Sequence, residues 1–169
     1  MPRRVALAAS LLCAACAAAR PAPSGARRVG DPLELAAQDL GGGAVDVAAD
    51  RGRVRVVDFW ATWCAPCREE LPALAAMEKD LRSRGLSVYA VSFDEDRSLI
   101  APFLASTGPA PRVLWDPGGD RWAAVYEVER LPTTLVVDRR GIIRFVHQGY
   151  DARTAAAQRR EVEALLSEP

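Results

Sequence analysis

The sequence predicts an α/β fold in which a central mixed β-sheet is flanked by helices. Apolar runs of strand length alternate along the chain with segments of helical periodicity. Two pairs of strand-like runs are separated by only three residues that include glycine, which is typical of antiparallel hairpins. Half of the 169 residues are apolar and 26% are charged, which fits a folded globular protein. Strands linked by helices run parallel and hairpin strands antiparallel, so the predicted sheet is mixed.

One folded domain is expected over residues 33–169. Residues 20–32 read RPAPSGARRVGDP; they are rich in proline, glycine and arginine and have no apolar periodicity. We expect them to form a flexible linker. Lysine plus arginine and aspartate plus glutamate both total 22, so no net field recruits nucleic acid.

Residues 1–19 have the pattern of a secretory signal peptide. Two arginines precede an uncharged apolar run that is shorter than the roughly 20 residues of a membrane span. Two cleavage sites are open. The alanines at residues 17–19 fit an ordinary signal-peptidase site, whereas LCAAC at residues 12–16 resembles a bacterial lipobox with Cys16 as the lipid-bearing N-terminus. Cys13 stands where that motif usually has leucine. Either site predicts export.

The first half of the domain predicts a hairpin, a strand, a helix and a second strand. Residues 33–40 and 44–48 flank three glycines and form the hairpin. Residues 54–60 and 86–93 are near-continuous apolar strands. Between them, residues 67–84 have helical spacing that stops at a glycine; its apolar positions are Leu71, Leu74, Met77 and Leu81.

The second half continues the alternation between helical and extended segments. The expected elements are a helix at 98–106, a short extended piece at 113–115, a helix at 120–126, hairpin strands at 135–138 and 142–147, and an amphipathic helix at 154–166. Asp151 lies just before the last helix, where an aspartate side chain caps free backbone amides.

The most informative stretch, WATWCAPCR at residues 60–68, holds the two cysteines of the predicted domain. Cys64 follows the strand and stands where the next helix is expected to begin, so amides of the first turn and the helix dipole favour its thiolate. Such positions lower a cysteine pKa from about 8.5 to roughly 3.5–7.5. Pro66 fits a first helical turn, and Cys67 lies close enough to form a small disulfide ring.

Two other uses of the cysteine pair are weaker. A structural zinc site needs about four ligands, and the chain offers one pair and a single histidine, His147, in a distant strand. His147 is expected to be a surface or edge residue of the sheet. A structural disulfide constrains a long loop, and this loop is short. Reversible dithiol–disulfide chemistry is therefore the best interpretation.

The quoted residues resemble a known family. VVDFWATWCAPC is similar to the active-site strand and helix start of thioredoxins, and FWATWCAPCREELPAL with the later LPTTLVVD resembles the TlpA/ResA-like thiol–disulfide oxidoreductases. The similarity runs from residue 33 to the C-terminus. It implies a thioredoxin-like fold with an N-terminal β-hairpin and an inserted helix–strand segment over residues 98–115.

The resemblance also implies residue roles. Cys64 would attack a substrate disulfide and Cys67 would resolve the mixed disulfide. Pro132 matches the family's cis-proline. Leu131 would present its backbone to an extended substrate. The expected substrate-binding residues are Trp63, Pro66, Leu131 and Pro132.

Two carboxylates and one arginine complete the expected site. Asp58 stands where thioredoxins bury an aspartate beneath the resolving cysteine, where burial would raise its pKa and let it take the Cys67 proton. Glu70 matches an acidic residue of ResA-like proteins, or is a solvated residue favoured by the helix dipole. Arg130 replaces the usual glycine before Leu-Pro-Thr; it either steers acidic partners or faces solvent.

The expected function is an exported thiol–disulfide oxidoreductase of the bacterial envelope or periplasm, with no cofactor beyond the Cys64–Cys67 disulfide. The resemblance implies that it reduces envelope proteins in cytochrome c maturation or copper-site assembly and takes electrons from a membrane thiol-transfer protein. Two alternatives stay open: an oxidant that introduces disulfides, and a copper(I)-binding chaperone. A peroxidase is excluded because its Pro-x-x-x-Thr-x-x-Cys motif is absent around Cys64.

Overall fold

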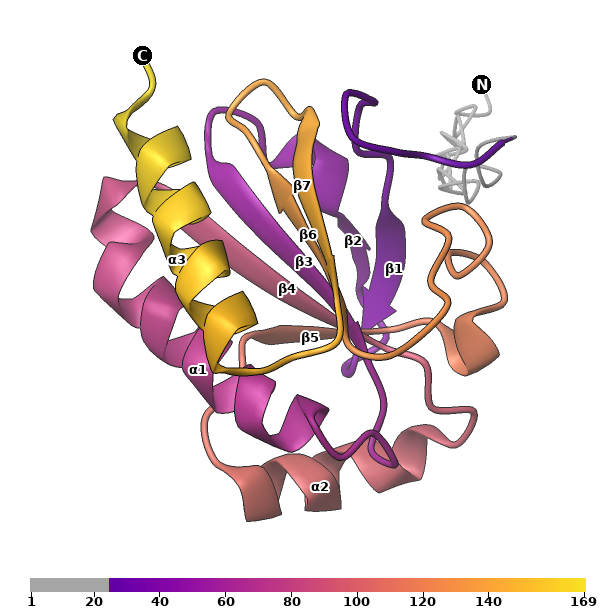
Figure 1. Ribbon diagram of the computed structural model, residues 1–169. Coiled ribbons are helices and arrows are strands. Elements are labelled where there is room, and N and C mark those ends of the chain that lie inside the picture. Colours follow the sequence, from indigo (N-terminus) through magenta and orange to yellow (C-terminus); the bar gives the residue numbers. More distant parts are fainter. Residues whose placement is uncertain (1–24) are drawn as a thin grey trace, which may run out of the picture.

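The computed structural model describes residues 25–169, which form a seven-stranded sheet with α-helices packed against it (Figure 1). The strands lie in the order β2-β1-β5-β4-β3-β6-β7. They are β1 (Ala36–Asp39), β2 (Ala44–Asp46), β3 (Val54–Trp60), β4 (Leu86–Ser92), β5 (Arg112–Trp115), β6 (Thr133–Val137) and β7 (Ile143–Gln148). The α-helices of this part of the chain are α1 (Cys67–Leu81), α2 (Ile100–Thr107) and α3 (Ala152–Ser167).

The sheet is mixed, as predicted. β3, β4 and β5 run parallel to one another, whereas β1–β2, β1–β5, β3–β6 and β6–β7 are antiparallel pairs. The two predicted hairpins therefore form at opposite edges of a parallel centre. All seven residues of β3 are buried, because this strand lies between β4 and β6 and both of its faces are covered.

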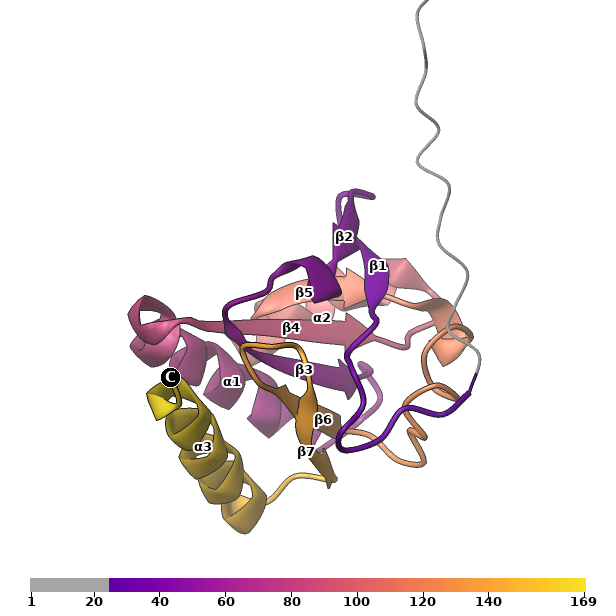
Figure 2. The ribbon, with the colours of Figure 1, turned by 90° about the horizontal axis from the view of Figure 1, so that it is seen from above.

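The two faces of the sheet are covered in different ways (Figures 1 and 2). α1 and α3 pack on one face, where Leu74 and Val162 meet Val56 and its neighbours. The other face is covered by the segments that flank β1 and β2 and by the chain between β5 and β6, through Leu35 and Trp122. The helices thus occupy one face, and connecting segments close the other.

The predicted helix at residues 120–126 is wrong: this stretch is a series of turns. Its backbone hydrogen bonds do not keep one helical spacing. The Ala123 amide donates four residues back, to the Gly119 carbonyl, whereas the Val128 amide donates five residues back, to the Ala123 carbonyl. The Asp116 carboxylate accepts the Trp122 amide at 3.0 Å and Gly119 has a φ of +73°, so the chain turns at the start of this stretch without propagating a helix. The Trp122 and Tyr126 side chains of this stretch are nevertheless buried.

The N-terminal segment also differs from its prediction. The flexible linker expected over residues 20–32 is wrong from Arg27 onward, because the Arg27 amide donates to Val125 and the Gly30 amide to Ile143. Pro32 forms a β-bridge with Ile142. The expected signal peptide and Cys16 lie outside the described residues. Within residues 25–169, no helix is both long and apolar enough to cross a membrane.

The inserted segment forms a third cluster of buried side chains around the cysteines. α2 contributes Ile100 and Phe103, and β5 contributes Val113; they pack with Trp60 from β3 and with both cysteines. The Trp60 and Phe103 rings have centroids 5.2 Å apart. In Figure 1, α2 lies across the end of the sheet to which β3 leads. The predicted helix–strand insertion therefore forms one wall of the cysteine site.

The cap of α3 gives a direct test of this architecture. The Asp151 carboxylate accepts the Thr154 amide at 2.7 Å and its hydroxyl at 3.0 Å, as the sequence predicts. Asp151→Ala should lower the free energy of unfolding by about 1 kcal/mol, whereas Asp151→Ser, which keeps an accepting oxygen, should cost less. Urea denaturation followed by circular dichroism measures both. Equal stability of the alanine variant and the parent protein would contradict the cap.

Candidate functional site

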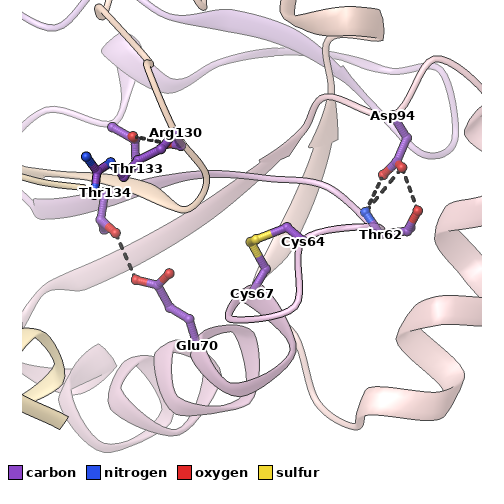
Figure 3. Close-up of a disulfide and its surroundings, with 8 residues drawn as sticks. All are labelled: Thr62, Cys64, Cys67, Glu70, Asp94, Arg130, Thr133 and Thr134. Atoms are coloured by element: carbon purple, nitrogen blue, oxygen red, sulfur yellow. Dashed lines mark hydrogen bonds between the residues drawn. A yellow bond between two sulfur atoms is a disulfide. The ribbon is translucent and has the colours of Figure 1, made fainter. Parts of the chain in front are cut away.

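The cysteine pair lies at the carboxyl end of β3 and is joined as a disulfide (Figure 3). The Cα atoms of Cys64 and Cys67 are 5.4 Å apart. α1 begins at Cys67, the first residue of the predicted helix, with Pro66 as its cap residue, so Cys64 lies in the turn just before the helix. Cys64 keeps 4% of its surface exposed and Cys67 none, which matches the predicted order of exposure.

The turn that carries Cys64 is tied to the end of β4 by one buried carboxylate. Asp94 accepts the Thr62 hydroxyl at 2.6 Å and the Thr62 amide at 3.1 Å (Figure 3). The Ser92 hydroxyl donates to the same carboxylate at 2.8 Å, and the Trp115 indole donates to the Asp94 carbonyl at 2.7 Å. Asp94 therefore holds the backbone two residues before Cys64.

A second polar group lies buried among the elements next to Cys67. Glu70 is one helical turn after Cys67, and its Oε1 accepts Thr134 Oγ1 at 2.8 Å and Gln158 Nε2 at 2.9 Å. Gln158 also donates to Thr134 at 3.0 Å. Glu70 is fully buried, so its interpretation as a solvated residue is wrong. β6, α1 and α3 each supply one member of this cluster.

Asp58 is the other buried carboxyl group of the site. It lies in β3 directly opposite Thr134 of β6 and is fully buried, as predicted. Neither Asp58 oxygen, nor Oε2 of Glu70, has a hydrogen-bond partner within residues 25–169. Burial, and then the charge of Glu70, raise the pKa of Asp58 well above its ordinary value.

Burial also raises the pKa of Glu70, although its hydrogen bonds from Gln158 and Thr134 oppose that rise. Two carboxyl groups that are both desolvated and close enough to interact do not ionise independently. The raised pKa values allow this pair to take up a proton at a higher pH than an ordinary carboxyl group. This capacity is what distinguishes the pair from surface carboxylates.

The loop before β6 completes the site. The Leu131–Pro132 peptide bond is cis, as predicted. Thr133 Oγ1 donates to the Arg130 carbonyl at 2.6 Å, and the Gly149 amide donates to the Pro132 carbonyl at 2.7 Å. The backbone of Leu131 forms no hydrogen bond with the described chain.

Trp63 and Leu131 line one cavity, whereas Pro66 is half-buried at the start of α1. Trp63 is 72% exposed, while Trp60 is fully buried beneath the cysteines. Two of the four expected substrate-binding residues, Trp63 and Leu131, thus share one cavity.

Sequence reasoning missed three residues of the site: Asp94, Thr134 and Gln158. Gln158 could have been found from the sequence. It lies four residues before Val162, on the apolar face of α3, and a polar side chain on a buried face indicates a buried hydrogen-bond partner. Thr134 and Asp94 gave no such signal, since a threonine in a strand and an acid after one are common. His147 lies on edge strand β7 and contacts Glu161 at 2.6 Å, as expected of a sheet-edge residue.

Comparison with known proteins agrees with this geometry. The family model described as Redoxin matches residues 17–166. The thioredoxin-like protein YneN of Bacillus subtilis is 30% identical over 116 residues, which cover 67% of this chain and 66% of YneN. The thiol-disulfide oxidoreductase ResA of the same organism is 30% identical over 112 residues, which cover 66% of this chain and 62% of ResA. Each match spans slightly less than two thirds of the relative.

A solved structure supports the same assignment. A candidate thiol:disulfide interchange protein DsbE from Chlorobium tepidum superposes with a TM-score of 0.78 and 29% identity, over 84% of this chain and 100% of that one. The fold, the Cys-x-x-Cys disulfide and the cis-proline loop are thus accompanied by similarity along most of the sequence. The chain therefore belongs to the Redoxin family, in which it is similar to the ResA-like thiol-disulfide oxidoreductases of thioredoxin-like fold.

Proposed function

We propose that this protein is an exported thiol–disulfide oxidoreductase that reduces disulfides in envelope proteins. One observation carries the proposal: the strand that leads to the Cys64–Cys67 disulfide and the helix that begins at Cys67 each bury a carboxyl group, Asp58 and Glu70, whose proton affinity is raised. A structural disulfide has no use for a buried proton acceptor. A dithiol that must lose a proton in each turnover needs such an acceptor.

The reaction starts from the reduced pair. The Cys64 thiolate attacks one sulfur of the client disulfide, which forms a mixed disulfide and releases the other client sulfur as a thiolate that takes up a proton. Cys67 then loses its proton and attacks Cys64. The client leaves as a dithiol, the Cys64–Cys67 disulfide forms, and two electrons have passed to the client.

The carboxyl pair takes up the Cys67 proton. Burial of both groups, and the charge of Glu70 acting on Asp58, raise their affinity for protons, so an ionised carboxylate of the pair accepts the Cys67 proton directly or through one water. Thr134 and Gln158 fix the Glu70 carboxylate by donating to one oxygen, which leaves the other available. No cofactor besides the disulfide is required, since the electrons reside on sulfur.

The same charges favour a reducing role. Strong oxidants of this fold are oxidising because their reduced form is stabilised. Three buried carboxyl groups belong to the elements that carry the pair: Asp58 is in β3, Glu70 is one helical turn after Cys67, and Asp94 holds the turn of Cys64. Negative charge close to a thiolate disfavours it. The oxidised protein is thereby favoured, which makes the dithiol a reductant.

The cellular setting follows from the N-terminal sequence. Residues 1–19 support export to the bacterial envelope, with Cys16 as the site of lipid attachment. An exported reductant needs electrons from across the membrane, so a membrane thiol-transfer protein is the proposed donor. Apocytochrome c and copper-site proteins are the proposed clients, because both need reduced cysteines before their metal centres assemble.

The order of the two cysteines can be tested by trapping. Cys67→Ser should accumulate mixed disulfides between Cys64 and client proteins, stable until reductant is added, because the resolving thiol is gone. Cys64→Ser should trap far fewer, since Cys67 is fully buried. Non-reducing electrophoresis of the purified variants with a disulfide-bonded client measures both. Equal trapping by the two variants would contradict the assigned roles.

The carboxyl pair can be tested by the pH dependence of mixed-disulfide resolution. Asp58→Asn should slow resolution by Cys67 about 100-fold near pH 7, because asparagine accepts no proton. Glu70→Gln should shift the midpoint of the rate profile to lower pH, since the repulsive neighbour of Asp58 is removed. Glu69→Gln is the matched control, because Glu69 is the adjacent, exposed glutamate. Identical profiles for the two glutamine variants would exclude Glu70.

Stability gives a readout of Asp58 that does not depend on turnover. Its pKa is raised in the folded protein, so ionisation costs stability as the pH rises above the ordinary value of the carboxyl group. Asp58→Asn should therefore gain free energy of unfolding relative to the parent protein at neutral and higher pH, and gain little near pH 4. A gain that is the same at every pH would show that Asp58 does not titrate.

A further inference from the structure

A cavity of about 790 Å³ opens beside the disulfide. Trp63 from the cysteine turn and Leu131 from the cis-proline loop form part of its wall, and Leu99 joins them from the segment before α2. Trp63 is 72% exposed and Leu99 51%, so both offer apolar surface to a ligand. Trp63 directly precedes Cys64, so the cavity adjoins the turn of the cysteine that a client disulfide has to reach.

The charged residues of this cavity are mostly acidic. Asp94, Glu95, Asp96 and Glu129 line it, against a single arginine, Arg130. The whole chain has equal numbers of acidic and basic residues, so this excess is local. Negative charge gathered in a cleft raises the concentration of positively charged ligands there.

The four acidic residues differ in whether their carboxylates accept hydrogen bonds from the protein itself. Asp94 holds Thr62, and Asp96 accepts the Ser98 amide at 2.8 Å. Glu95 and Glu129 have no hydrogen bond or ion pair with any described residue, 25–169. Their charges are therefore available to a ligand. Glu95 follows β4 and Glu129 precedes β6, so two separate segments bring these charges to the cavity.

We propose that this cavity binds a positively charged segment of the client protein, with lysine or arginine close to the client's disulfide cysteine. The apolar part of the segment packs against Trp63 and Leu131, and its cationic side chains lie near Glu95 and Glu129. An exposed tryptophan adds a favourable site for a cation over its ring. The inference rests on the proposed function, since it specifies the substrate of that same disulfide.

Among the described residues, Arg130 carries the one positive charge in the cavity wall, and this charge opposes the binding of a cationic client. It is exposed, lines the cavity and forms no ion pair with any residue of the described chain. One arginine among four acids does not reverse the sign of the cavity, so the interpretation that Arg130 recruits acidic partners is not favoured. Arg130→Ala should therefore increase the preference for cationic clients.

The test compares three short peptides whose single cysteine is joined to 2-mercaptoethanol and flanked by lysines, glutamates or serines. Pre-reduced protein reduces each in a single turnover: the peptide and mercaptoethanol leave as thiols and Cys64–Cys67 is oxidised. At low ionic strength, the lysine peptide should react about tenfold faster than the glutamate peptide, and ~0.5 M salt should remove most of the difference. Arg130→Ala should widen the ratio.

Two double variants carry the same change of net charge. Glu95→Gln with Glu129→Gln should bring the lysine and glutamate rates together. Glu163→Gln with Glu168→Gln removes two carboxylates near the end of α3, where Glu168 pairs with Arg144, and should leave the ratio unchanged. An equal loss of the ratio in both double variants would assign it to net charge and overturn the cavity as its cause.

The remaining outcomes separate the two proposals. Equal rates for all three peptides would overturn the cationic preference and leave the reductase function intact. Faster reduction of the glutamate peptide would also overturn it and would assign recognition to Arg130. If the reduced protein reacts with none of the peptides, nor with neutral hydroxyethyl disulfide, the proposed function itself is wrong.

Discussion

The constraint on which the site depends is the burial of two carboxyl groups, Asp58 and Glu70, in the layer between the sheet and its helices. Burying an unpaired acid is unfavourable, so the surrounding structure has to compensate for it. β6 and α3 do so in part by directing Thr134 and Gln158 at one oxygen of Glu70. The remaining oxygens have no partner in the described chain, which leaves the pair with a raised affinity for protons.

Much of this arrangement could be predicted because it follows from local pattern. The continuous apolar run of β3 fixes Asp58 in the interior, and the cysteine spacing predicts the redox pair. The cis bond at Pro132 was expected from the family resemblance. What could not be predicted depends on contacts between distant segments. Gln158 reaches Glu70 across 88 positions of sequence, and no periodicity within α3 indicates that partner.

The predicted helix at residues 120–126 and the predicted linker at residues 20–32 were wrong for the same kind of physical reason. The apolar spacing at residues 120–126 is that of a helix, yet Gly119 and the Asp116 carboxylate turn the chain at its start. The composition of residues 20–32 is that of a linker, yet the backbone from Arg27 onward pairs with the domain. In each case, specific hydrogen bonds outweighed the tendency of the local sequence, and the aromatic side chains of residues 120–126 cover the face of the sheet that the helices leave open.

If the carboxyl groups near the disulfide make this protein a reductant, its reduction potential has to be strongly negative and has to depend on them. Equilibration with a dithiol buffer at pH 7, read by alkylation and mass, gives the value for the parent protein and for Asp58→Asn combined with Glu70→Gln. We expect about −270 mV or lower for the parent protein, in the range of thioredoxin, and a less negative value for the double variant. A potential of the parent protein near −120 mV, the range of strong oxidants, would show that the protein is not a reductant.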